Sequence, residues 1–168
     1  MLTASGCSTA PDAEDRQSFL VESGAATEWF LANVNGLERQ VARSAGYIVF
    51  PSIGQWGLMF GGGQFGRGVL CDADGTPVGW AAINTVSLGL QAGVQGFKMF
   101  LVLENEAVKR RFMENTFSGG VGGTVVVAQE GGSAKAAFEQ GVALYQGANS
   151  GLMAGVNIGL DRLRYEPL

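Results

Sequence analysis

Apolar and polar positions alternate along much of the chain with a period of two, which is the spacing of a β-strand covered on one face. The most regular stretch is 88–95, where leucine, alanine and valine alternate with glycine and glutamine. A closely similar pattern returns at 152–160. The run 97–103 is almost wholly apolar, and it predicts a central strand covered on both sides. Much of the chain after residue 45 is therefore expected to form a sheet.

Two segments instead carry helical spacing. Residues 12–43 start with acidic side chains and repeat apolar positions about one turn apart, which predicts helices with a break near Gly24. Residues 104–117 are expected to form a further helix, capped by Asn105. Its apolar stripe would consist of Val108, Phe112 and Met113. A short helical turn is also considered for 134–138.

The composition agrees with a sheet that has many tight turns. Of the 168 residues, 27 are glycine and only 15% are charged, which argues against many exposed helices. The pattern predicts an α+β fold, in which N-terminal helices and one later helix pack on a strongly bent antiparallel β-sheet or small β-barrel. One folded domain is expected over 12–168, after a short N-terminal segment at 1–11.

Residues 46–70 are the segment around which the sheet is expected to form. The apolar run before Pro51 should stop there, because proline has no amide hydrogen and belongs at a strand end or edge. Turn-forming residues at 52–57 should then lead into a glycine-rich strand. The string Gly61–Gly66 satisfies G-x-G-x-x-G, but a strand follows it where a dinucleotide site requires a helix. These glycines are expected to bend the sheet and to permit close packing.

Charge and residue content exclude several functions. The net charge of −4 provides no basic field for nucleic acid. The chain has no histidine, the commonest general base and metal ligand, and its two cysteines lack the spacing of a zinc site. Asp72–Gly75 indicates a hairpin turn and lacks the bidentate glutamate of a calcium loop. A non-enzymatic protein without cofactor or metal is expected.

The first residues look like the end of a bacterial lipoprotein signal. Small residues precede Cys7 in the sequence Leu-Thr-Ala-Ser-Gly-Cys, as the signal peptidase requires, and the chain is expected to begin inside the signal peptide. Residues 1–11 would then be a signal remnant, lipobox and tether. Two interpretations stay open: Cys7 is lipidated, or it is a free cysteine or pairs with Cys71. With lipidation, Ser8 resembles an outer-membrane sorting signal, which predicts a lipid-anchored protein of the bacterial cell envelope.

Two groups of basic residues are candidates for contact with lipid. The run 109–111 is the only one with three consecutive basic residues, and on a helix it could meet lipid phosphates while a neighbouring aromatic ring rests against acyl chains. The second group lies four residues apart on the short helix near residue 40 and shares one face. For both groups the alternative is a solvated helix face. The candidates are Lys109, Arg110, Arg111, Phe112, Arg39 and Arg43.

The glycine-rich segments together resemble the signature of the SYLF domain family. The matching segments are Ala-Gly-Tyr-Ile-Val-Phe-Pro-Ser at 45–52, Gly-Leu-Met-Phe-Gly-Gly-Gly at 57–63, Gly-Arg-Gly-Val-Leu at 66–70, Ser-Leu-Gly-Leu-Gln-Ala-Gly-Val-Gln at 87–95 and Gly-Leu-Met-Ala-Gly-Val at 151–156. The resemblance spans roughly residues 25–162. It implies a lipid-binding domain, because eukaryotic members bind phosphoinositides and a yeast member also binds actin filaments.

The chain departs from the family in its N-terminal segment. Family members are credited with lipid contact through basic residues there, whereas 12–38 is mostly acidic and Arg16 is its only cation. Phosphoinositide specificity is therefore not carried over, and actin is not an expected partner. The expected function is that of an envelope lipoprotein whose SYLF-like domain binds phospholipid or a membrane surface. The alternative is a structural or protein-interaction module of the envelope.

Overall fold

A computed structural model describes residues 9–58, 61–87, 93–117, 120–121, 126–128, 136–148, 158–159 and 162–168. Over these residues the chain has the α+β class that the sequence predicts. The helices are α1 (Arg16–Asn33), α2 (Leu37–Ala42) and α3 (Glu106–Met113). The strands are β1 (Gly46–Leu58), β2 (Gly61–Cys71), β3 (Pro77–Ser87), β4 (Gly93–Leu103), β5 (Gly120–Val121), β6 (Val126–Ala128), β7 (Val142–Ala148), β8 (Ile158–Gly159) and β9 (Leu163–Pro167). Cys7 and the patterned residues 88–92 and 151–157 lie outside this description.

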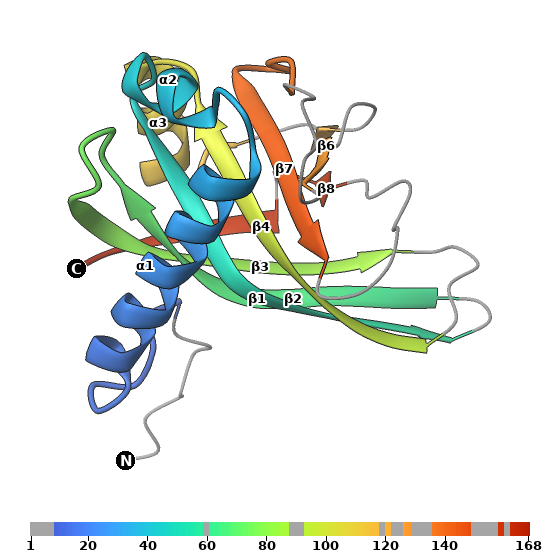
Figure 1. Cartoon of the computed structure of the whole chain (residues 1–168). Helices are drawn as coiled ribbons and strands as arrows, with labels where there is room; N and C mark the ends of the chain where they lie inside the picture. Colours follow the sequence, from blue (N-terminus) through green and yellow to red (C-terminus); the bar gives the residue numbers. More distant parts are fainter. Residues whose placement is uncertain are drawn as a thin grey trace.

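Seven strands form one sheet in the order β6-β7-β4-β1-β2-β3-β9 (Figure 1). All neighbouring strands in the run β7-β4-β1-β2-β3-β9 pair antiparallel, and of the seven strands only β6 pairs in parallel, with β7. Strands β5 and β8 pair separately. Because β6 and β9 are the two ends of the sheet, the described strands do not close into the small barrel that the sequence left as an alternative. The strength of the bend stays a prediction.

Each face of the sheet carries its own hydrophobic core. Helices α1 and α2 contribute Phe30 and Leu37 to one core, and Figure 1 shows α1 lying across that face. Helix α3 contributes Phe112 to the core on the other face. Strand β4 supplies both cores, since Phe100 belongs to the first and Met99 to the second. The predicted central strand at 97–103 is therefore confirmed.

Strand β1 differs from its prediction at Pro51. The strand continues through this proline to Leu58, and it lies between β2 and β4 in the middle of the sheet. The pairing shifts here, because Val49 pairs with Val69 but Ser52 pairs with Arg67. This β-bulge releases the proline from the ladder, which is the one interior position where proline is tolerated. The turn expected at 52–57 was likewise wrong.

One helical prediction was also wrong in detail. Helix α1 runs without a break through Gly24, because burial of Ala26 and Phe30 outweighs the cost of about 1 kcal/mol for one interior glycine. No helical turn forms at 136–138, the described part of the segment considered for one. The cap of α3 is confirmed, since the amide of Val108 donates to Oδ1 of Asn105 over 3.1 Å.

The glycines of β2 serve close packing, as predicted. A Cβ on Gly68 would lie 2.5 Å from the carbonyl oxygen of Val49, opposite the β1 bulge. A Cβ on Gly66 would lie 2.9 Å from the carbonyl oxygen of Ser52. Strand β2 then ends in the predicted hairpin turn, where Gly75 has φ +91°. The G-x-G-x-x-G string therefore lies in a strand, which agrees with the rejection of a dinucleotide site.

One side chain covers part of the outer edge of β9. The amide group of Asn115 donates to the carbonyl oxygen of Tyr165 over 3.2 Å and accepts from its N–H over 2.7 Å. Asn115 has φ 54°, a left-handed conformation that asparagine tolerates better than most residues. Its side chain thus occupies the hydrogen-bonding groups that a further strand would use, which protects the edge.

Candidate functional site

The run 109–111 predicted to contact lipid is only partly available on the surface. Lys109 forms an ion pair with Asp72 of the β2–β3 turn, and its side chain is 12% exposed. Phe112 is 1% exposed and belongs to the core, so it does not present its ring to acyl chains. The guanidinium of Arg111 lies 5.7 Å from the ring centre of Phe117. Of this group only Arg110 is classed as exposed, whereas Lys109 and Arg111 are half-buried.

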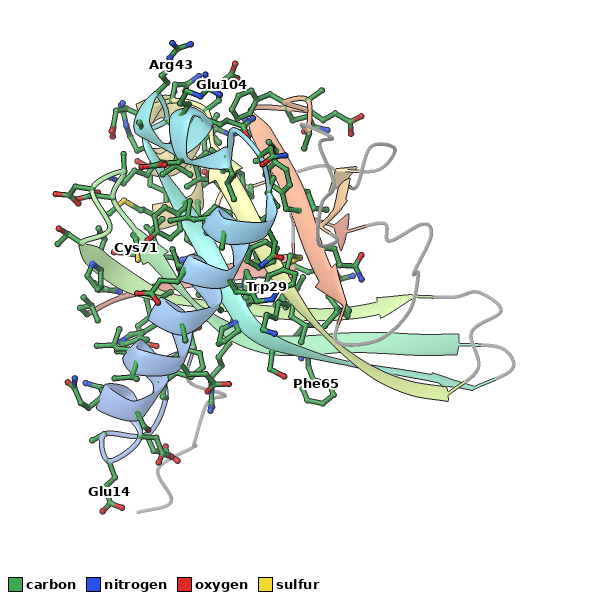
Figure 2. All side chains as sticks on the ribbon, viewed as in Figure 1. Glu14, Trp29, Arg43, Phe65, Cys71 and Glu104 are labelled. Carbon is green, nitrogen blue, oxygen red and sulfur yellow. The ribbon has the colours of Figure 1, made fainter. Side chains whose placement is uncertain are left out.

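The second basic group, Arg39 and Arg43, is exposed on α2 and at its end. It lies at the same end of the sheet as α3, because the amide of Ala45 donates to the carbonyl oxygen of Leu103 over 3.0 Å. Figure 2 shows both Arg43 and Glu104 at this end. The structure therefore brings the two predicted groups to one end of the molecule, but it intersperses them with acidic residues. This arrangement is compatible with the solvated helix face that the sequence left as the alternative.

A different feature has the form of a binding site. An open groove of about 1070 Å³ lies between the first half of α1 and the face of the sheet that α1 covers. Its volume is in the range of small-molecule sites. Strands β1, β2, β3 and β9 form its floor, and α1 and the segment before it form its wall.

The floor is built from cross-strand neighbours that lie far apart in the sequence. Ser52 pairs with Arg67, which pairs with Ala82, which in turn pairs with Arg164. Paired residues project to the same face, so two arginines flank a small alanine. With strands about 4.8 Å apart, the Cα atoms of the two arginines are about 10 Å apart. Arg162 also lines the groove, two positions before Arg164.

An aromatic ring lies in the next row of the floor. Phe65 pairs with Gly54 on one side and with Asn84 on the other. A Cβ on Gly54 would lie 2.5 Å from Cζ of Phe65, so glycine is what allows the ring to lie over β1. Phe65 is nevertheless 57% exposed, and Figure 2 shows it projecting from the sheet into open space. The floor therefore presents an exposed aromatic ring in the row next to the arginines.

The wall comes from one stripe of α1. Asp15, Ser18, Phe19 and Glu22 line the groove at spacings of three and four residues, which places them on one side of the helix. The same stripe continues into Ala26 and Phe30, which are buried in the core. The sheet-facing side of α1 is therefore polar over the groove and apolar beyond it.

The N-terminal segment closes one end of the groove. Ala10 is 1% exposed and its amide donates to Oε2 of Glu166 over 3.4 Å. Nε of Arg16 donates a hydrogen bond to the carbonyl oxygen of Pro11 over 3.4 Å. The guanidinium of Arg16 lies 5.9 Å from the ring centre of Trp80. Thr9 and Pro11 line the groove as a result.

The groove is remote from the predicted basic groups. Those groups lie where β1 begins at Gly46, whereas the floor lies at Ser52 and Gly54, about 25 Å along the strand at 3.3 Å per residue. Sequence reasoning missed the groove residues because they come from four strands and one helix. The available signals were the period-two spacing of Phe65 and Arg67 and the helical spacing of Asp15 and Glu22.

Burial shifts the pKa of two side chains in the core that α1 covers. Burial raises the pKa of the Cys71 thiol to about 11, and burial also raises the pKa of the Tyr47 hydroxyl. Among the described residues Cys71 is a buried free thiol, while the state of Cys7 stays a prediction. Among the described side chains no group of three or more acidic or cysteine residues is placed to hold a metal ion.

Within the described part of the chain, no helix combines the length and apolar character needed to cross a bilayer. No protein-family model matches the chain, and no curated protein matches it significantly.

Proposed function

We propose that this protein is a non-enzymatic, lipid-anchored protein of the bacterial envelope whose SYLF-like domain binds phospholipid through the groove between α1 and the sheet. The observation that carries the proposal is the floor of that groove, where arginines stand beside an exposed phenylalanine. Guanidinium groups bind phosphate oxygens through paired N–H donors. An aromatic ring supports the glycerol and acyl region next to the headgroup.

The charge of the groove also supports a phosphate ligand. Its lining contains Arg67, Arg162 and Arg164 against the carboxylates of Asp15 and Glu22, an excess of one positive charge in a chain whose net charge is −4. A local positive region on an acidic protein is where an anionic group would be recruited. The predicted group on α3 offers less to a phosphate, because Phe112 is buried and Lys109 is already paired with Asp72.

The position of the N-terminal segment fits a membrane-anchored protein. Thr9 lines the groove and follows Cys7 by two positions. At about 3.5 Å per residue, a lipid on Cys7 would hold this end of the groove within about 10 Å of the bilayer surface. Attachment and ligand binding would thus occur on one side of the molecule.

A non-enzymatic role fits the chemistry of the chain. The sequence has no histidine to activate a nucleophile. The thiolate of Cys71 is scarce near neutral pH, because burial raises its pKa to about 11.

Vesicle flotation of the full-length chain carrying Cys7→Ser tests the proposal without the contribution of an acyl anchor. The expected result is binding to phospholipid vesicles that weakens as salt is added, because arginine–phosphate attraction is screened. The double variant Arg67→Gln/Arg164→Gln should bind about tenfold more weakly, while its fold is checked by circular dichroism. The variant Arg39→Gln/Arg110→Gln removes the same charge from the other end of the molecule and should bind as the parent does.

Three results decide between the alternatives. Equal weakening by the two double variants would indicate non-specific attraction of the bilayer to net charge and would refute the groove. A loss confined to Arg39→Gln/Arg110→Gln would place binding on α2 and α3. Absence of binding to any vesicle at low salt would refute lipid binding and leave a structural or protein-interaction module of the envelope.

A further inference from the structure

The charges that line the groove are separated by element. The arginines stand on the sheet, at Arg67 of β2, Arg164 of β9 and the neighbouring Arg162. The carboxylates stand on the helix side, where Asp15 precedes α1 and Glu22 lies within it. The groove therefore has a positive floor and a negative wall.

The carboxylates of the wall and the arginines of the floor have similar spacings. Asp15 and Glu22 are seven residues apart, which is about 10 Å along a helix that rises 1.5 Å per residue. The Cα atoms of Arg67 and Arg164 are also about 10 Å apart across β3. Ala82 between the arginines and Ser18 between the carboxylates are small. Phe19, which also lies between the carboxylates, has its ring centre 6.2 Å from that of Trp80.

We infer that the groove selects a zwitterionic headgroup that carries a phosphate and a primary ammonium, as in phosphatidylethanolamine. The phosphate lies on the floor and accepts from the guanidinium groups of Arg67 and Arg164. The ammonium points to the wall and donates its N–H groups to the carboxylates of Asp15 and Glu22. This inference rests on the proposed lipid-binding function and names its ligand.

The same geometry disfavours the other common headgroups. Phosphatidylglycerol has no ammonium group to place beside Asp15 and Glu22. Both carboxylates therefore stay unpaired while the lipid phosphate, another anion, lies near them. Phosphatidylcholine carries a cation without N–H donors, so it forms no hydrogen bond with the wall. A charge-assisted hydrogen bond accounts for roughly a tenfold change in affinity or more. The expected order of affinity is therefore ethanolamine first, by about tenfold over both of the others.

Soluble lipids test the inference without a bilayer. The full-length Cys7→Ser chain is titrated with dihexanoyl phosphatidylethanolamine, phosphatidylcholine and phosphatidylglycerol, each below its micelle concentration, and amide chemical shifts are followed. Shifts should gather at Ser52, Ala82 and Asn84 of the floor. Phosphoethanolamine and inorganic phosphate are titrated in parallel. Tighter binding of the lipid than of phosphoethanolamine identifies a lipid ligand, whereas equal binding identifies the free headgroup and overturns the lipid assignment.

Charge-neutral variants of the wall provide the sharpest readout. Asp15→Asn/Glu22→Gln should weaken ethanolamine-lipid binding about tenfold and strengthen phosphatidylglycerol binding, which reverses the order. Glu14→Gln/Glu28→Gln removes two charges from exposed positions that do not line the groove, and it should leave the order unchanged. A fold defect cannot produce a gain for phosphatidylglycerol, so the reversal is specific to the wall.

The failures are distinguishable. If the three lipids bind equally, or if the wall variant keeps the parent's order, headgroup selection is refuted while lipid binding stands. Tighter binding of the choline lipid would indicate recognition by the rings of Phe19 and Phe65 and would also refute the inference. If no lipid binds, both this inference and the proposed function are refuted.

Discussion

The substitution Tyr145→Phe tests how the segment around residue 136 is held to the sheet. The hydroxyl of Tyr145 donates to Oε1 of Gln40 over 2.5 Å and accepts from the amide of Ala136 over 3.1 Å. Nε2 of Gln40 donates in turn to the carbonyl oxygen of Ala136 over 3.3 Å. All three residues are at most 5% exposed, so water does not replace a lost partner.

The magnitude follows from the two groups that the substitution leaves unpaired. Removal of the hydroxyl leaves Oε1 of Gln40 and the N–H of Ala136 without this hydrogen-bond partner. Each buried unpaired group costs about 1–3 kcal/mol. The ring still fills its site, so no cavity term is added. We expect the free energy of unfolding to fall by about 2–6 kcal/mol, and the Tm of a chain of this size to fall by about 4–24 °C.

Urea unfolding followed by tryptophan fluorescence measures this change, with Tyr165→Phe as the matched control. Among the described residues, the hydroxyl of Tyr165 makes one long bond, 3.5 Å, to the carbonyl oxygen of Val78, and its loss should cost less than about 1 kcal/mol. Combining Tyr145→Phe with Gln40→Leu should give less than the sum of the single effects, because both remove the same bond. Equal destabilisation by the two tyrosine variants would refute the network.

Two further predictions concern stability. Asn115→Ala removes both bonds to Tyr165 and places alanine at φ 54°, so the free energy of unfolding should fall by about 1–2 kcal/mol in urea titrations. Asn115→Gly should recover only the part of this loss that comes from the strained backbone of alanine. Full recovery of stability would show that the two hydrogen bonds to Tyr165 contribute nothing. Burial raises the pKa of Cys71 from 9.0 to about 11. The contribution of the protonated thiol to the free energy of unfolding is therefore fully present below pH 9 and is lost as the pH rises through about 11. Thermal unfolding from pH 8 to 11 should show a steeper loss for the parent than for Cys71→Ala, and parallel curves would contradict the assignment.

The pattern of the sequence anticipated the parts of the fold that depend on local spacing. Alternation and the apolar run at 97–103 indicate strands, and α3 begins at the expected cap, Asn105. Pro51 and Gly24 misled the prediction, because each signals a break that tertiary packing overrides. A bulge accommodates the proline, and burial of Ala26 and Phe30 on the sheet-facing side of α1 offsets the cost of the glycine.

The predicted site was limited by what a single segment can show. A run of basic residues at 109–111 indicates charge, but it does not show that Lys109 pairs with Asp72 on a turn 37 positions earlier. Helical periodicity placed Phe112 on an apolar stripe, and the same stripe directs it into the core. The groove residues gave no local signal beyond their spacing.

What the sequence determined by itself is therefore an α+β class, a largely antiparallel sheet, a glycine-rich centre and a chain without histidine. A period of two or 3.6 residues fixes which face a side chain occupies, because it follows from backbone geometry alone. Tertiary structure decided which residues share that face. Strand order and register brought Ser52, Arg67, Ala82 and Arg164 into one row, and the passage of α1 above them placed two carboxylates opposite the arginines. Neighbours across strands are set by long-range pairing, so the groove exists only in the folded chain.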